Sequence, residues 1–97
     1  MNIYITDKAN QWFKEEVGLG SGDKVRFYSK IYGSSKVQEN YSLAFTIDAD
    51  DDKAVTAITA DGIVYYVNEP DLWFFDGHDL YIEYDEQLEE VAYDYKK

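Results

Sequence analysis

Residues 70–82 read PDLWFFDGHDLYI, a run that places a helix-starting proline, a helix-ending glycine and an apolar strand one after another. Proline cannot donate a hydrogen bond within a sheet but fits the first turn of a helix, so we expect a short helical turn over residues 70–75. Gly77 should end this turn, and a strand should follow over residues 80–84. Three apolar side chains of the segment are expected to reach the core: Leu72, Phe75 and Leu80.

The N-terminal part of the chain predicts a strand followed by one amphipathic helix. Residues 2–5 form the short strand, and Thr6 offers its hydroxyl as the N-cap of the helix. Apolar residues then recur at helical spacing and form one stripe: Ala9, Trp12, Phe13 and Val17. Gly18 should end the helix. We expect the stripe to pack on the protein's own sheet.

The rest of the chain is a series of strands, marked by side chains that alternate between apolar and polar. The expected strands cover residues 25–31, 41–47, 54–59, 63–67, 80–84 and 91–95. Their buried faces should carry Val25, Phe27 and Ile31 in one strand, and Tyr41, Leu43, Phe45 and Ile47 in the next. Asp61 and Gly62 strongly predict a tight hairpin. The order predicts one small α+β domain over residues 1–97, with mostly antiparallel sheet pairing.

The composition excludes several classes of function. The chain carries a net charge of -11 from 20 acidic and 9 basic residues, so its field repels nucleic acid and anionic membrane surfaces. It contains no cysteine, which excludes disulfides, thiolate metal sites and thiol catalysis. No basic-apolar leader and no apolar run near ~20 residues is present, so a cytoplasmic protein is expected.

His78, the sole imidazole, and its neighbours Asp76 and Asp79 are the candidates for a metal site. Such ligands would suit a hard cation such as iron(III). As a general base, His78 has no cysteine and no nearby serine to activate, so no catalytic residues are predicted. The simpler interpretation is a turn residue whose ring caps backbone groups or faces water. We therefore predict neither a metal nor a cofactor.

Two further clusters have a structural interpretation beside a functional one. Residues 48–52 resemble the start of a calcium-binding loop, but Lys53 replaces the required glycine and Thr59 stands where a bidentate glutamate belongs. A solvated acidic turn is expected there. The C-terminal part is rich in tyrosine, at positions 81, 84, 93 and 95. These rings could form a recognition surface or simply serve as half-buried strand residues.

Several of these segments resemble the HesB-like iron-sulfur cluster biosynthesis family, the IscA-like or A-type carriers. Residues 5–9 are similar to the family's opening strand and helix start, and residues 61–63 to its hairpin. Residues 24–27, 33–35 and 41–45 resemble the strands around its cysteine-containing turn. Residues 72–82 are similar to its Leu-x-x-Leu-Asp-Gly segment. The resemblance covers nearly the whole chain and implies a HesB-like fold.

The resemblance also implies what is missing, because family members bind iron or a cluster through cysteine thiolates. Ser34 stands at the position of the first cysteine, and the C-terminal pair is absent. The expectation is a non-catalytic binding or adaptor protein beside iron-sulfur assembly proteins, acting through its acidic, tyrosine-rich surface or a loop. The candidate interaction loop comprises Ser34, Ser35 and Lys36. The alternative is a metal-handling protein that uses carboxylates and His78 for a hard cation; an enzyme is the weakest hypothesis.

Overall fold

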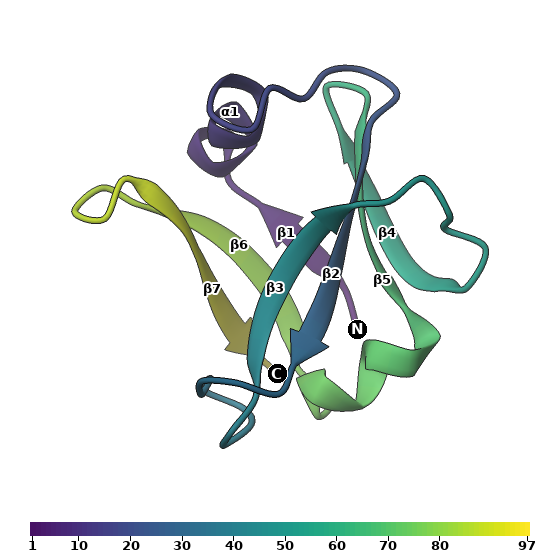
Figure 1. The fold of residues 1–97 in the computed structure, drawn as a ribbon, viewed down its shortest axis with the longest axis vertical. Helices are drawn as coiled ribbons and strands as arrows, with labels where there is room; N and C mark the ends of the chain where they lie inside the picture. The colour runs from purple at the N-terminus through teal and green to yellow at the C-terminus, as the bar shows by residue number, and fades with distance from the viewer.

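Two sheets, one of three strands and one of four, share a single core in the computed structural model, which describes residues 1–97 (Figure 1). The helix lies at one end of this core, and a 3-10 helix lies at the other. The elements in chain order are β1 (Ile3–Ile5), α1 (Asp7–Glu15), β2 (Lys24–Lys30), β3 (Ser42–Ile47), β4 (Ala54–Ala60), β5 (Ile63–Asn68), the 3-10 helix η1 (Glu69–Phe75), β6 (Asp79–Asp85) and β7 (Glu90–Lys96). The predicted α+β class and the order of elements are confirmed. No helix has the length and apolar character needed to cross a membrane.

The strand pairing is mostly antiparallel, as expected, but it includes parallel pairs that were not expected. The sheets have the orders β1-β6-β7 and β3-β2-β5-β4. Three pairs are antiparallel, but β1 runs parallel to β6 and β2 runs parallel to β5, so both sheets are mixed. The parallel pairs join strands far apart in the chain, and local alternation of side chains carries no information about such partners. A HesB-like fold is not established by this topology.

The helix α1 starts as its sequence predicts and ends earlier than expected. Thr6 Oγ1 accepts a hydrogen bond from the Ala9 amide at 3.1 Å, which makes Thr6 the N-cap. The helix ends at Glu15, two residues before the predicted end of the apolar stripe at Val17. Phe13 is fully buried, and its ring contacts aromatic rings at centroid distances of 5.0–6.3 Å: Trp12, Phe27, Phe45 and Tyr65. Phe13 thus joins the helix to three strands of the larger sheet.

A chain of polar contacts also fixes α1 to the hairpin between β4 and β5. The Tyr65 hydroxyl donates to Asn10 Oδ1 at 2.6 Å, and Asn10 Nδ2 donates to Asp61 Oδ2 at 2.8 Å. Lys14 Nζ contacts the same carboxylate oxygen at 3.1 Å. Burial raises the pKa of Tyr65, so its hydroxyl stays protonated and donates. Asn10 is buried because these partners satisfy its polar side chain.

The predicted hairpin is present between β4 and β5. Ala60 pairs with Ile63, and the two turn residues, Asp61 and Gly62, have φ angles of 51° and 79°. Both angles are positive, as a tight type I′ connection requires. A Cβ atom on Gly62 would lie 2.2 Å from Ser21 Oγ, so only glycine fits against the loop that follows α1.

The decisive segment, residues 70–82, folds as a turn and a strand but buries different side chains from those expected. Phe75 and Leu80 are fully buried as predicted. Leu72 was predicted inside, yet it is 39% exposed, while Asp71 is 7% exposed. Asp71 takes the inner position because its carboxylate finds hydrogen-bond partners on β2, and this turns the neighbouring Leu72 toward solvent.

Two further core predictions fail at the ends of strands. Val25 and Phe27 are buried as expected, but Ile31 is 71% exposed because β2 ends one residue before it. Ile47, the last residue of β3, is 47% exposed. The alternating pattern continues past the point where the second sheet covers the first, and periodicity alone cannot locate that point.

We expect Phe13→Ala to lower the free energy of unfolding by about 3–5 kcal/mol, because it removes the ring that contacts three strands and leaves a cavity. Urea unfolding followed by circular dichroism measures this change. Leu88→Ala serves as the control, since Leu88 is 67% exposed and its loss should cost no more than about 0.5 kcal/mol. Equal losses for both variants would contradict the central role of Phe13.

Candidate functional site

The residues predicted as metal candidates lie around the end of η1 and make local contacts there. His78 Nδ1 lies 2.8 Å from the Phe75 carbonyl oxygen and 3.1 Å from that of Asp76. Asp76 is the left-handed residue that ends η1, with φ at 48°. Asp79 Oδ1 accepts a hydrogen bond from the Asn2 amide at 2.7 Å. No group of three or more histidine, aspartate or glutamate side chains comes close enough together to hold a metal ion.

The predicted interaction loop, Ser34 to Lys36, lies against β7. The Ser35 amide donates to the Gln38 carbonyl, and the Gln38 amide donates to Ser35 Oγ, each at 3.0 Å. Lys36 Nζ lies 3.0 Å from Asp94 Oδ1 of β7. The hydrogen bond from Lys36 is the main cause that lowers the pKa of Asp94, and a hydrogen bond from the Tyr95 amide lowers it further. The loop is therefore linked to the edge of the smaller sheet by an ion pair.

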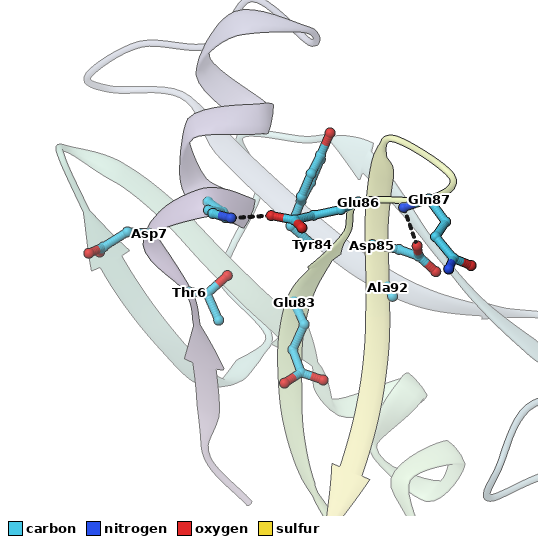
Figure 2. A pocket seen from close by; sticks show the side chains of 9 residues that line it. Thr6, Asp7, Glu83, Tyr84, Asp85, Glu86, Gln87 and Ala92 are labelled. Atoms are coloured by element: carbon cyan, nitrogen blue, oxygen red, sulfur yellow. Dashed lines mark hydrogen bonds and ion pairs between the residues drawn. The ribbon is translucent and has the colours of Figure 1, made fainter.

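A shallow polar hollow of about 660 Å³ lies between the start of α1 and the β6–β7 turn (Figure 2). Its lining is mostly acidic and polar: Thr6, Asp7, Lys8, Glu83, Tyr84, Asp85, Glu86, Gln87 and Ala92. Lys8 hydrogen bonds to Glu86, and this contact raises the pKa of Lys8 and lowers the pKa of Glu86. Lys8 and Glu86 therefore hold each other in their charged forms.

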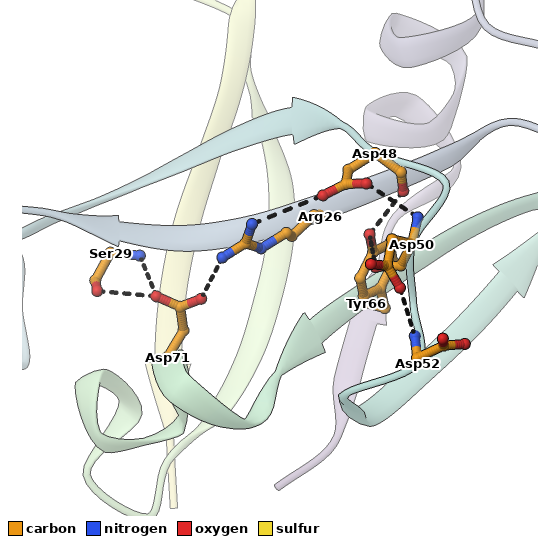
Figure 3. A network of polar contacts seen from close by, with 7 residues as sticks. All are labelled: Arg26, Ser29, Asp48, Asp50, Asp52, Tyr66 and Asp71. Carbon is orange, nitrogen blue, oxygen red and sulfur yellow. Dashed lines mark hydrogen bonds and ion pairs between the residues drawn. The ribbon is translucent and has the colours of Figure 1, made fainter.

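A polar network joins η1, β2 and the acidic turn that follows β3 (Figure 3). Asp71 accepts hydrogen bonds from Arg26 at 3.2 Å and from the amide and hydroxyl of Ser29 at 3.2 and 3.1 Å. Arg26 also lies 3.7 Å from Asp48. The Tyr66 hydroxyl lies 2.6 Å from the Asp48 carbonyl oxygen. The turn expected to be merely solvated is thus fixed to β2 and β5, and the network has a structural role.

The hollow with the most apolar side chains in its lining lies between β3 and β7, which are edge strands of the two sheets. One hollow of about 390 Å³ is lined by Trp12, Lys30, Leu43, Ala44, Phe45, Glu90, Val91 and Tyr93. A second, of about 250 Å³, is lined by Ser34, Ser35, Lys36, Ser42, Leu43, Tyr93 and Tyr95. They share Leu43 and Tyr93 and so lie next to each other along the same two strands; together we call them the β3–β7 seam. Figure 1 shows β3 and β7 side by side, one from each sheet.

The tyrosines at the C-terminal end separate onto the two faces of the smaller sheet. Tyr93 and Tyr95 pack against the core beside the seam, and burial raises the pKa of both. Tyr81 stacks on Tyr4 at a centroid distance of 4.7 Å, with Lys96 Nζ 4.5 Å from its ring. The loop and the tyrosines were singled out from the sequence as candidates, but the seam was not. No local signal indicates that β3 and β7 are edges that face each other.

Comparison with known proteins gives a consistent result along the whole chain. The chain is 45% identical over 96 residues to a pyruvate dehydrogenase inhibitor of Bacillus subtilis, with 99% of this chain and 100% of that protein covered. It is 34% identical over 95 residues to an uncharacterized protein of Staphylococcus saprophyticus, covering 96% and 97% of the two chains. An uncharacterized protein of Staphylococcus aureus is 30% identical over 98 residues, covering 99% and 100%. No protein-family profile matches the chain, and no solved structure matches it.

The resemblance to HesB-like iron-sulfur proteins is therefore wrong, and so are the iron-sulfur adaptor function that it implied and the alternative metal-handling function built on carboxylates and His78. The full-length similarity is to a protein named as an inhibitor of pyruvate dehydrogenase. The segments that suggested the resemblance have local explanations. Thr6 caps a helix, Asp61 and Gly62 form a hairpin turn, and Asp76 ends η1 in a left-handed conformation. Such residues recur wherever these turns form, whatever the family.

Asp71→Ala should lower the free energy of unfolding by about 1–3 kcal/mol, because it leaves the Ser29 amide and one side of Arg26 without their acceptor. Thermal or urea unfolding measures the change. Asp52→Ala is the matched control, since its exposed carboxylate accepts no hydrogen bond and its removal should cost at most about 0.5 kcal/mol. A neutral Asp71→Ala would show that the network does not support the fold.

Lys36→Ala should raise the pKa of Asp94 toward that of an ordinary aspartate, because Lys36 is the main cause of its lowered pKa. Folding lowers the pKa of Asp94, so its ionised form stabilises the folded state. This contribution to the free energy of unfolding is present above the pKa of the unfolded state and is lost as the pH falls through the pKa of the folded state. A carboxyl-carbon NMR titration measures the change. Lys14→Ala, which removes the cationic partner of Asp61 instead, should leave the pKa of Asp94 unchanged. An unmoved Asp94 in Lys36→Ala would exclude the ion pair in solution.

Proposed function

Because the chain belongs to the family that contains the pyruvate dehydrogenase inhibitor of Bacillus subtilis, we propose that it is a non-catalytic regulatory protein that binds a pyruvate dehydrogenase complex and lowers its activity. The observation that carries this proposal is the 45% identity over 99% of this chain and 100% of that inhibitor. The alignment therefore spans the core, both sheets and the surface between them. A shared fold with a shared binding surface is the simplest consequence of such coverage.

The chemistry of the surface supports an inhibitor that acts by binding. Lys8 and Glu86 of the polar hollow form an ion pair with each other, and the hollow with the most apolar side chains in its lining lies along strand edges. Strand edges and apolar grooves are features that proteins use to bind peptide segments. The candidate loop Ser34 to Lys36 lines one end of the β3–β7 seam and remains part of the proposed surface.

The net charge of -11 indicates what kind of surface the partner presents. An acidic protein associates fastest with a basic patch, because complementary fields steer the encounter. Dissolved salt screens such fields over about 8 Å at physiological ionic strength. Binding to the complex should therefore weaken as the salt concentration rises.

Purified protein should reduce NADH production from pyruvate by the Bacillus subtilis pyruvate dehydrogenase complex in a saturable, stoichiometric manner. Inhibition by binding depends on the molar ratio and reverses when the protein is removed, whereas an enzyme that modified the complex would act at low ratios and with time. Activity titrations at several ratios, incubation times and salt concentrations distinguish these cases. An unrelated protein of similar negative charge controls for non-specific effects. Full activity at a large molar excess would refute the proposed function.

A further inference from the structure

We propose that the β3–β7 seam binds an extended segment of the partner, which adds a β-strand to the exposed sheet edge. The identity of the partner rests on the proposed function, whereas the nature of the segment rests on the seam itself. Strand addition needs three features: backbone groups without partners, a groove that accepts every second side chain, and charges that select the segment. The seam has all three.

The backbone groups along the outer edge of β7 are not paired with any other strand. Successive residues of a strand direct their N–H and C=O groups to opposite sides. On β6, the Leu80 amide donates to the Asn2 carbonyl at 2.9 Å, so the alternate residue Tyr81 faces β7. Tyr81 pairs with Asp94 and Glu83 with Ala92, so these β7 residues bond to β6. The amides and carbonyls of Val91 and Tyr93 therefore point out into the seam.

The outer edge of β3 faces the seam in the same way. The Asp48 amide donates to the Lys24 carbonyl at 3.1 Å, which shows that the even-numbered residues of β2 face β3. Tyr28 pairs with Ala44, and Arg26 pairs with Thr46, so these β3 residues bond to β2. The backbone groups of Leu43 and Phe45 are left pointing outward. Two strand edges with free donors and acceptors thus flank the seam.

The floor of the seam is apolar and closed from below by core side chains. The rings of Phe27 and Tyr93 meet at 5.8 Å beneath it and connect the two sheets. The side chains that line the first hollow are mostly apolar, and Phe45, Val91 and Tyr93 pack against the buried core. An extended segment points alternate side chains in the same direction. The seam therefore suits a segment with an apolar residue at every second position.

The charges near Trp12 select a basic segment at this end of the seam. Trp12 lines the seam and also a neighbouring hollow that carries Glu15 and Glu16. Its Nε1 donates to the Glu89 carbonyl at 3.1 Å, and Glu90 lines the seam itself together with one cationic side chain, Lys30. Lysine or arginine residues flanking the apolar positions would complement these glutamates. A second copy of this chain, with its own net charge of -11, would be repelled.

Hydrogen exchange followed by mass spectrometry tests the proposal on the unmodified protein. Peptides that contain the Val91 and Tyr93 amides should exchange quickly in the free protein and more slowly when it is bound to the Bacillus subtilis complex. The outward-facing amide of Ala57 provides an internal control. The Val64 amide of β5 donates to the Asp23 carbonyl beside β2 at 3.0 Å, so Tyr66 also faces β2 and its pairing partner Ala57 lies on the free edge of β4. Its exchange should not change on binding.

Val91→Pro tests the same edge by removing one outward amide while leaving the ladder to β6 intact. Losing a single backbone hydrogen bond should raise the concentration needed for half-inhibition about tenfold. Ala57→Pro is the matched control, because it places the same residue at an outward position of the remote edge strand, and it should inhibit like the unmodified protein. Circular dichroism melting checks that both variants fold; the exchange experiment needs no variant.

The outcomes separate the two proposals. Slower hydrogen exchange of the Val91 and Tyr93 amides on binding, together with weaker inhibition by Val91→Pro, would support the seam as the binding surface. Two results would overturn the seam and leave the proposed function intact. In the first, the unmodified protein inhibits but its edge amides are not protected on binding; in the second, Val91→Pro inhibits as strongly as the unmodified protein. Edge amides that become protected at high protein concentration without the complex would identify a second copy as the occupant and also overturn it. Absence of inhibition by the unmodified protein removes the proposed function and, with it, this partner.

Discussion

The packing of one ring, Phe13, is the constraint on which the arrangement of the sheets depends. It contacts rings from β2, β3 and β5, while α1 is anchored to the smaller sheet where the Thr6 amide donates to the Ile82 carbonyl at 3.1 Å. Phe27 and Tyr93 continue the contact between the sheets below it. Because aromatic side chains fill this space, β3 and β7 approach through side chains and not through backbone hydrogen bonds, which is why the seam exists.

Much of the fold follows from local sequence, and the failures share one cause. The helix cap at Thr6, the hairpin at Asp61 and the turn that starts at Pro70 depend on neighbouring residues, and all were predicted. The parallel pairs, and the exposure of Leu72, depend on distant partners. Asp71 displaces Leu72 only because β2 supplies an arginine and a serine amide at that point. The periodicity of apolar residues shows which side chains share a face of a helix or strand, but it does not show which other element covers that face.

The candidate site was less predictable than the fold, for the same physical reason. A strand edge can bind another segment only when no neighbouring strand pairs with it. The residues of β3 and β7 do not indicate in sequence that these strands lie at the edges of their sheets. Short motifs were also misleading about lineage, since turn-forming residues are selected by backbone geometry in unrelated proteins. Net charge, in contrast, affects which partners are attracted whatever the fold.

The free edges of β3 and β7 have a consequence for the protein's behaviour in solution. Unpaired strand edges are templates on which other chains can assemble, and proteins guard them with charge. Here the glutamates near Trp12 stand beside the edge that we propose as a binding surface. The same carboxylates would then have two roles: they would attract a basic segment, and they would repel other copies of the chain. Solubility and recognition are thereby coupled, and selection cannot change one without affecting the other.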